Sequence, residues 1–568
     1  MPGAGGGAII APVKRQSILA GASIMMVAAL LSRLLGWVRD RAIGHFWGSS
    51  GHTDAYWAAF GVPDLLYYLL AGGALGAAVI PVFAGYLRNN EEGESWHVAN
   101  TLVTLFGLCA IGGIALIIAF APLLITLVAP GFAAKRGPEA VAECAGYVRT
   151  IAPMVFFTVM SALFTGILQS HRHFTAPALA WLVYNFGIIA GAFVGGAWAA
   201  GRYGDQAGLR VLCLGVVVGA MLLVAVQVPS LLARGFRYRF QLDLEHPGVR
   251  EVLRLFLPYM GGLAFTQLCL LWLPSFFGSF FPEGAITSLR YANRLVVLPL
   301  GLFGIAISTA AFPVMADRAA AGEMAEFRRL FSGALRAVFL LSVPSAALLI
   351  SLAGPMLRLL WRSGKFGEAA IAGAEFCLLY YALALIGLSG LQVVNRAFYS
   401  LRDARTPPLV GVGYTLLVAG LAIALMSTPL QYAAIAAATS VGVTAGMLVM
   451  LAALGRRLGG ADGGAIFASF ARTSAASVAL GLVAYHVSRL VGDRLGVPAT
   501  RFALSAAAAG GGAGPPAPIA AVAVQLLLSM AAGGMAYLVV LRLLGAPELG
   551  TFRAVVRRRG CPPTAPME

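Results

Sequence analysis

Apolar residues run in long blocks along most of this chain, and short polar segments separate the blocks. A block of about 20 apolar residues is long enough to cross the hydrocarbon core of a bilayer as a helix. The blocks lie at residues 17–46, 53–87, 97–128, 140–169, 175–200, 207–233, 250–281, 285–317, 326–361, 369–400, 406–427, 430–455, 466–491 and 517–545. The pattern therefore predicts an all-α membrane protein with about 14 transmembrane helices.

The composition agrees with this pattern and narrows the function. Of the 568 residues, 59% are hydrophobic and 11% charged, and the mean hydropathy is +0.84. The net charge of +17 is spread between the apolar blocks and forms no basic arm, so nucleic acid is not an expected partner. The six cysteines are isolated, and no P-loop, GxSxG or HExxH motif occurs. We expect no enzyme activity, no metal and no cofactor.

Basic residues are distributed unevenly between the two sets of loops. The loops after even-numbered blocks hold most of them, for example Arg88, Arg172, Arg234 and Arg402. By the positive-inside rule these loops and both termini are cytoplasmic. Residues 1–16 then form a disordered cytoplasmic N-terminus and residues 546–568 a cytoplasmic tail.

Three pairs of segments indicate an internal repeat. Residues 71–84 resemble 302–316, 121–132 resemble 354–366, and 170–177 resemble 400–407, with every offset close to 231 residues. Two six-helix parallel repeats follow, an N-lobe at 17–235 and a C-lobe at 250–456, arranged as two lobes around a central cavity. The helices at 466–545 lie outside the repeat. Gly, Ala and Pro are common in membrane helices, so chance similarity is an alternative that stays open.

The first block carries charged residues on one face. At 100° per residue, Ser32, Arg33, Arg39 and Asp40 share an arc of about 120°, whereas Arg41 points away from it. A charge at the centre of a membrane helix costs about 2.5–3.5 kcal/mol on insertion scales, so such a face is expected to line a cavity.

Two explanations for these charges remain. Internal pairing, for example of Arg39 with Asp54, would be structural only. The eighth block adds Arg290 and Arg294, however, so that positive charges exceed negative ones in both predicted lobes. Arginine binds phosphate and pyrophosphate through two parallel hydrogen bonds, which favours a diphosphate ligand.

Several motifs together resemble one family. They are SRLLGWVRDRAIGHFWG, TDAYWAAFGVPDLL, GGALGAAVIPVF, APGF, RYANRLVVLPLGLFGIAISTAAFP, SGKF and AFYSLRDARTP. The set is similar to the MurJ/MviN family of lipid II flippases, within the multidrug/oligosaccharidyl-lipid/polysaccharide exporter superfamily. The resemblance covers roughly residues 17–550.

This resemblance implies a function and a location. Family members move lipid II, the undecaprenyl-diphosphate-linked peptidoglycan precursor, from the inner to the outer leaflet of the bacterial inner membrane by alternating access. It further implies membrane lipids and cell-wall synthesis machinery as partners, and a lipid-facing groove at 466–545 for the polyprenyl tail.

Matching the motifs residue by residue gives a candidate site. The substrate-binding residues implied in this way are Ser32, Arg33, Arg39, Asp54 and Arg294, and the supporting ones are Asp40, Asp64, Tyr67 and Arg290. Tyr67 stands where the family usually has a basic residue. That departure leaves room for another polyprenyl-diphosphate-linked oligosaccharide as substrate, for a cation-coupled drug exporter on the same scaffold, or for a non-transporting membrane scaffold.

The sequence also bears on the energy source. Sodium coupling in the family has been linked to the seventh and eleventh helices, yet no Asp or Glu occurs between Glu251 and Glu283 or between Asp403 and Asp462. A hard cation prefers oxygen ligands that include a carboxylate. We therefore expect the membrane potential, rather than sodium, to drive transport.

Overall fold

The computed structural model describes residues 18–71, 74–403, 405–460, 462–500 and 518–546. All regular secondary structure within these ranges is helical, which confirms the all-α prediction. The predicted disordered N-terminus (1–16) and all but the first residue of the predicted tail (546–568) lie outside the described residues.

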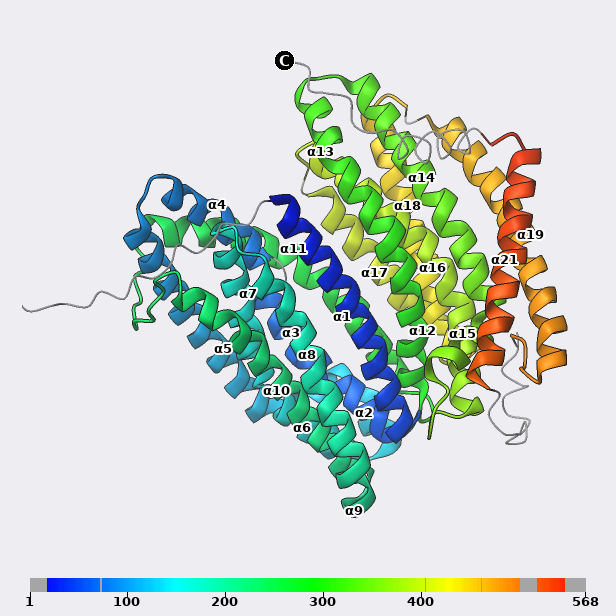
Figure 1. Cartoon of the computed structure of the whole chain (residues 1–568), viewed down its shortest axis with the longest axis horizontal. Coiled ribbons are helices and arrows are strands. Elements are labelled where there is room, and N and C mark those ends of the chain that lie inside the picture. Colours follow the sequence, from blue (N-terminus) through cyan, green and yellow to red (C-terminus); the bar gives the residue numbers. More distant parts are fainter. Residues whose placement is uncertain (1–17, 72–73, 404, 461, 501–517, 547–568) are drawn as a thin grey trace, which may run out of the picture. The chain divides into compact units, whose positions relative to one another are not determined.

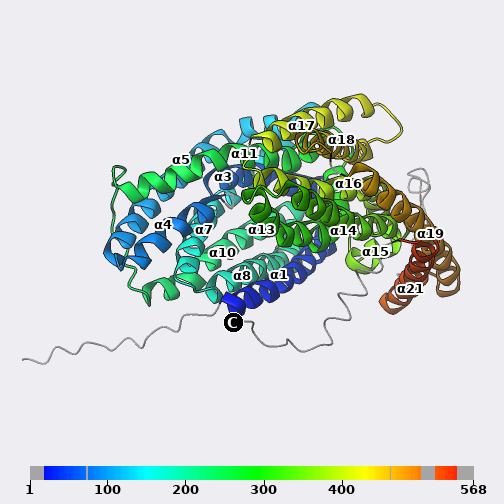
Figure 2. The ribbon, with the colours of Figure 1, turned by 90° about the horizontal axis from the view of Figure 1, so that it is seen from above.

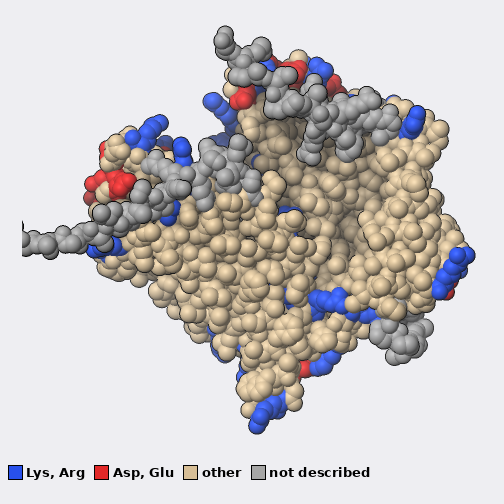
Figure 3. All heavy atoms as spheres, in the orientation of Figure 1, with Lys and Arg blue, Asp and Glu red and all other residues tan. Residues whose placement is uncertain are grey.

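Each of the fourteen apolar blocks coincides with a helix or with an interrupted helix. Eleven helices in the described part of the chain are long and apolar enough to cross a membrane. On the face shown in Figure 3, the charged side chains gather mostly at helix ends, with uncharged surface between them. The chain is thus a multi-pass membrane protein, while the count of 14 spans stays a prediction.

The chain divides into two compact units, and unit 1 comprises residues 1–283 together with Ser363–Lys365. Its helices are drawn from blue to green in Figure 1. They are α1 (Ile18–Trp47), α2 (Gly51–Ala59), α3 (Gly61–Leu70), α4 (Ala74–Arg88), α5 (Glu92–Val128), η1 (Phe132–Arg136), α6 (Pro138–Ile151), α7 (Met154–Ser170), α8 (Thr175–Phe193), η2 (Val194–Ala200), α9 (Gly201–Tyr203), α10 (Asp205–Leu232) and α11 (Pro247–Gly278).

Unit 2 comprises residues 284–362 and 366–568. Its helices are α12 (Ala285–Pro299), η3 (Leu300–Ile305), α13 (Ala306–Ala320), α14 (Met324–Ser351), α15 (Ala353–Trp361), α16 (Glu368–Ser400), α17 (Thr406–Leu425), α18 (Ala433–Arg457), α19 (Gly463–Leu495) and α21 (Ile519–Leu543). A buried core that includes Phe331, Leu335 and Phe398 packs α14 against α16 and α16 against α18.

The boundary between the compact units differs from the predicted boundary between the lobes. Helix α11 packs against α3, α4 and α5 and belongs to unit 1. The sequence repeat, in contrast, makes the segment of α11 the first helix of the C-lobe at 250–456. The two definitions differ by one helix, and the repeat itself stays a prediction.

Left-handed backbone positions recur at similar places in the two predicted copies. The pairs with positive φ are Gly48 and Gly284, Asn90 and Gly322, Gly137 and Gly364, Arg172 and Arg402, Gly204 and Gln431, and Gly235 and Gly459. Their offsets, from 224 to 236 residues, are close to that of the sequence repeat. Turns of the same hand between successive helices support the repeat prediction.

A stripe of small residues explains the close packing of α8 on α10, which run side by side in Figures 1 and 2. Gly187 and Gly191 of α8 meet Gly215 and Gly219 of α10, and a Cβ added at Gly191 would lie only 2.7 Å from the Cα of Gly215. Small residues four apart let membrane helices approach closely. This contact fixes α8, which carries one wall of the candidate site.

The second apolar block is interrupted twice. It forms α2, then α3 after Phe60, then α4 after Ala71. Broken helices in a membrane are tolerated where protein surrounds the freed backbone groups. The first two pieces carry three of the predicted site residues.

Candidate functional site

The polar face of α1 lies against α8 and meets a single asparagine there. Arg39 Nη1 donates to Asn185 Oδ1 (3.2 Å), and Asn185 Nδ2 donates to Ser32 Oγ (3.1 Å). Ser32 Oγ also lies 3.4 Å from the carbonyl oxygen of Trp181, to which it donates. Since Asn185 contacts both Ser32 and Arg39, these two residues share one face of α1, as the helical spacing predicts.

Arg39 is also held by its neighbour in the sequence. Its Nε and Nη2 atoms lie 2.9 and 2.8 Å from Asp40 Oδ1, and the two side chains are 14% and 3% exposed. Arg33, one turn and a half earlier, is exposed, and within the described part of the chain no residue binds its guanidinium. Helix α1 therefore carries more positive than negative charge along this face.

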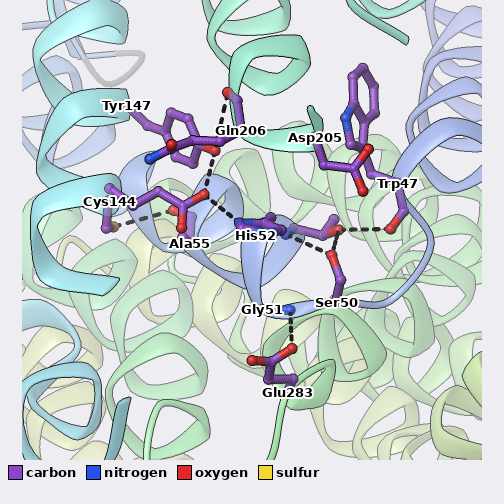
Figure 4. A network of polar contacts seen from close by, with 12 residues as sticks. Trp47, Ser50, Gly51, His52, Ala55, Cys144, Tyr147, Asp205, Gln206 and Glu283 are labelled. Carbon is purple, nitrogen blue, oxygen red and sulfur yellow. Dashed lines mark hydrogen bonds and ion pairs between the residues drawn. The ribbon is translucent and has the colours of Figure 1, made fainter. Parts of the chain in front are cut away.

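A polar network fixes the first turn of α2, which follows the C-terminal end of α1 (Figure 4). His52 Nδ1 and Glu143 Oε1 lie 2.7 Å apart, and the hydroxyl of Tyr147 donates to the same carboxylate at 2.5 Å. The backbone N–H of Gly51 donates to Glu283 (3.0 Å). These contacts join α2 to α6 and to the segment that follows α11.

The position of α2 in turn places Asp54 in a buried ion pair. Asp54 is fully buried, and its carboxylate lies 3.0 Å from Arg136 Nη2. Arg136 also donates to the carbonyl of Phe281 (3.4 Å) and lies over the ring of Phe132 (4.9 Å). In this structure Asp54 therefore links α2 to η1, and its predicted substrate contact stays a prediction.

The remaining predicted residues of unit 1 lie on α3. Asp64 and Tyr67 are half-buried, and the ring of Tyr67 packs edge-on against that of Tyr68 (5.4 Å). Neither residue belongs to the contacts around Asn185. The structure thus brings Ser32, Arg39 and Asp40 together and places the α2 and α3 residues in separate surroundings.

In unit 2 the predicted arginines lie on α12. Arg290 and Arg294 are four residues apart, on one helical face, and both are half-buried. A further arginine, Arg396 of α16, donates to Ser308 Oγ (3.2 Å) and lies over the ring of Phe312 (5.6 Å). Unit 2 therefore also carries guanidinium groups within apolar helices.

Three of these residues were not singled out by the sequence. Asn185 and Arg396 sit as lone polar residues inside apolar blocks, which is the signal that would have found them. Arg136 is one of few basic residues in the loops expected outside the cell, so it departs from the charge rule.

An apolar cavity of about 470 Å³ lies in unit 2 between α14, α16 and α19. Val343, Ile350, Leu383 and Leu482 are among the residues that line it. Helix α19 is the first of the two helices predicted to form the groove for a lipid tail. The tail-binding role of that groove stays a prediction.

Each unit offers guanidinium groups on a helix of the predicted site. Among the described residues, no group of three or more His, Cys, Asp or Glu side chains could hold a metal ion. The guanidinium groups of α1 and α12 are instead donors that match phosphate oxygens.

Solved structures show the same fold as this chain. The chain resembles a multidrug transporter of the MATE family in an inward-facing conformation, with a TM-score of 0.63, 14% identity and coverage of 78% of this chain and 98% of that one. It resembles the lipid II flippase MurJ in an inward closed conformation more fully, with a TM-score of 0.71, 20% identity and coverage of 95% and 100%. The chain therefore has the fold that these two membrane proteins share.

Sequence comparison identifies the family. The model of the family described as "Lipid II flippase MurJ" matches residues 43–501. The lipid II flippase MurJ of Burkholderia cenocepacia is 28% identical over 434 residues, which are 75% of this chain and 82% of that protein. The probable lipid II flippase MurJ of Haemophilus influenzae is 28% identical over 427 residues, or 73% and 82%. The chain belongs to the MurJ family of lipid II flippases, as the sequence motifs predicted.

Proposed function

We propose that this protein flips lipid II from the inner to the outer leaflet of the bacterial inner membrane by alternating access. The observation that carries the proposal is family membership over residues 43–501. Arg33 and Arg39 outnumber the single acid, Asp40, on the polar face of α1. The half-buried Arg39 can donate two parallel hydrogen bonds to a diphosphate. The relatives are named as transporters, and we propose no catalytic role.

Depletion tests this function. In cells that lack other flippases, removing the protein should lower outer-leaflet lipid II, and restoring it should return the level. Unchanged outer-leaflet lipid II after depletion would refute the assignment.

Two alternative functions predict different transport results. A drug exporter on the same scaffold would move cationic dyes out of vesicles. Its support is the likeness to the MATE structure, which at 14% identity concerns the fold alone. A flippase for another polyprenyl-diphosphate-linked oligosaccharide would leave lipid II unmoved but would carry that lipid. The relatives at 28% identity favour neither reading.

We further propose that the membrane potential drives the outward step. A headgroup with two diphosphate charges gains about 2.3 kcal/mol per charge per 100 mV as it moves to the positive side, reduced by any arginine charge that moves with it. Collapsing the potential should stop flipping, whereas replacing external sodium should not. Sodium-dependent flipping at a clamped potential would overturn this proposal.

The orientation and the partners complete the proposal. The excess of basic residues in one set of loops supports cytoplasmic termini. Protease protection of a tag on either terminus in inside-out and right-side-out vesicles tests this directly. Lipid II, membrane lipids and cell-wall synthesis proteins are the expected partners, and cross-linking in growing cells tests the last of these.

A further inference from the structure

Two helix ends, one in each unit, share an unusual conformation. Helix α7 ends at Ser170 and α16 at Ser400, and two residues later each chain has an arginine in the left-handed region, Arg172 with φ 54° and Arg402 with φ 59°. At each end the next N–H bonds to the carbonyl five residues earlier, at 2.8 and 2.9 Å. These are helix ends of the Schellman type, where glycine is the usual residue.

An arginine at such a position is costly. The left-handed conformation costs a residue with a Cβ about 1–2 kcal/mol, and glycine nothing. Retaining an arginine where glycine would be more stable points to a role for its side chain.

The surroundings of the two arginines differ in charge. In unit 2 the next residue is Asp403, whose carboxylate pairs with Arg457 (2.7 Å) and accepts from the hydroxyl of Thr406 (2.6 Å). In unit 1 the corresponding residue is His173. Burial, and then the nearby Arg234, lower the pKa of His173, so its ring is neutral at physiological pH. The unit 1 turn thus has a histidine where the unit 2 turn has a carboxylate.

The unit 1 turn also borders a cavity of about 510 Å³ between the ends of α4 and α7. Arg88, Ser170, His171 and Arg172 supply its polar wall, and no Asp or Glu is among its lining residues. Within the described part of the chain, no side chain or backbone group binds the guanidinium of Arg88 or Arg172. The volume lies in the range of small-ligand pockets.

We propose that this cavity is a binding site for a phosphate-bearing group, held by Arg88 and Arg172. Two guanidinium groups on one cavity can each direct a pair of N–H donors at phosphate oxygens. The positive-inside rule places this end of unit 1 at the cytoplasmic surface, where phosphate is available from lipid headgroups and from the cytosol. The site is separate from Arg39 and its contacts, so it does not rest on the flipping function.

A simpler role for these arginines is to offset the helix dipole at a C-terminus. That role needs no ligand and no cavity, and it applies equally to Arg402. The two turns of this chain therefore supply a matched pair for the test.

The test uses the full-length chain in a neutral detergent and measures affinity by microscale thermophoresis. Sodium pyrophosphate probes a free anion, dioctanoyl-phosphatidylglycerol probes a lipid headgroup, and dioctanoylglycerol is the control without phosphate. The variants are Arg88→Gln and Arg172→Gly in unit 1 and Arg402→Gly in unit 2. Thermal unfolding is recorded for each, because Arg172→Gly relieves the backbone and is expected to keep or raise the melting temperature.

We expect both unit 1 variants to bind the phosphate probes about tenfold more weakly than the wild type, and Arg402→Gly to bind as the wild type does. Tighter binding of phosphatidylglycerol than of pyrophosphate assigns the site to a lipid headgroup, and the reverse order assigns it to a free phosphate. Equal affinity of the wild type and Arg172→Gly, or binding of dioctanoylglycerol as tight as that of phosphatidylglycerol, overturns the proposal.

A further variant gives the unit 1 turn the residue that unit 2 has after its left-handed arginine. His173→Asp places a carboxylate beside Arg172 without removing either arginine. A weakening in the same direction as in Arg172→Gly supports the site, since the added negative charge lowers the positive potential beside the two arginines. Unchanged affinity for both phosphate probes contradicts it.

Discussion

Two arginine–aspartate pairs in unit 1 have similar geometry but different partners. Arg39 lies 2.8 Å from Asp40 with 14% of its side chain exposed, and Arg136 lies 3.0 Å from Asp54 with 13% exposed. The first pair joins neighbours on one helix. The second joins residues 82 positions apart, on α2 and η1. The two pairs are buried to a similar extent, and they differ in how far apart their residues lie in the sequence.

This difference assigns different roles to the two arginines. Arg136 binds a buried acid and a backbone carbonyl and lies over a ring, so the protein surrounds its guanidinium. Arg39 pairs with the next residue of its own helix and donates to Asn185 of α8. An arginine within an apolar helix whose ion pair stays on that helix is the better candidate for a ligand contact.

The largest effect is expected at Arg39. Arg39→Ala should abolish lipid II flipping, and so should Arg294→Ala in unit 2. Because Arg39→Ala leaves the buried carboxylate of Asp40 unpaired, flipping is compared per folded molecule. Arg39→Lys should restore little, because an ammonium cannot form two parallel hydrogen bonds. Arg41→Ala is the matched control, since Arg41 lies off the polar face. Complementation that tolerates all these changes equally would show that helical phase does not identify the site.

Arg136 should affect the stability of the fold and not the flipping rate per folded molecule. Removing one partner of a buried ion pair leaves the other charge uncompensated and costs about 3–5 kcal/mol. Arg136→Ala should therefore lower the melting temperature and the yield of folded protein. The double variant Asp54→Asn/Arg136→Gln should recover part of the loss. A melting temperature that stays at the wild-type value in Arg136→Ala would remove the distinction between the pairs.

A smaller effect is expected at Asn185, the link between the polar face of α1 and α8. Asn185→Ala removes one hydrogen bond to Arg39 and one to Ser32. Each such loss costs about 1–3 kcal/mol when the partner stays buried. We expect flipping to fall to a level between those of the wild type and Arg39→Ala, and Asn185→Leu serves as the control for volume. Flipping at the wild-type rate in Asn185→Ala would show that Arg39 needs no orientation from α8.

The smallest effect concerns pH at the start of α2. The hydrogen bond that the His52 ring donates to the Glu143 carboxylate raises the pKa of His52 above its usual value near 6.5. Its protonated form therefore stabilises the fold fully below pH 6.5, and this contribution is lost as the pH rises through the raised pKa. The melting temperature of the wild type should fall over that interval relative to His52→Gln. Parallel pH profiles of the two proteins would refute a contribution from this pair.

Helical spacing was enough to predict some of these contacts and not others. The shared face of Ser32 and Arg39 follows from the period of one helix, and the contacts to Asn185 agree with it. The partner of Asp54 does not follow, because Arg136 lies 82 residues away and meets it only through tertiary packing. The prolines of the second block, Pro63 and Pro81, predict kinks or breaks in it, but not that its helices end at Ala59 and Leu70. A proline in an apolar run indicates a kink, but its position does not fix where the helix ends.

The fold as a whole was easier to predict from the sequence. Fourteen apolar blocks and a set of short motifs pointed to an all-α exporter and to the family, because bilayer thickness and backbone satisfaction leave few structures for such a chain. The boundary between compact units was not accessible, since α11 packs with the helices of unit 1 although the repeat places it in the second copy.

The most direct test of the flippase function and its site is a flipping assay in proteoliposomes with an imposed interior-negative potential. The wild type, Arg39→Ala and Arg136→Ala are compared at equal amounts of folded protein, with lipid II in the leaflet that corresponds to the cytoplasmic side. We predict that Arg136→Ala flips at close to the wild-type rate per folded molecule and that Arg39→Ala does not flip. Equal rates for Arg39→Ala and the wild type, or equal loss in both variants, would contradict a role for Arg39 in binding the diphosphate.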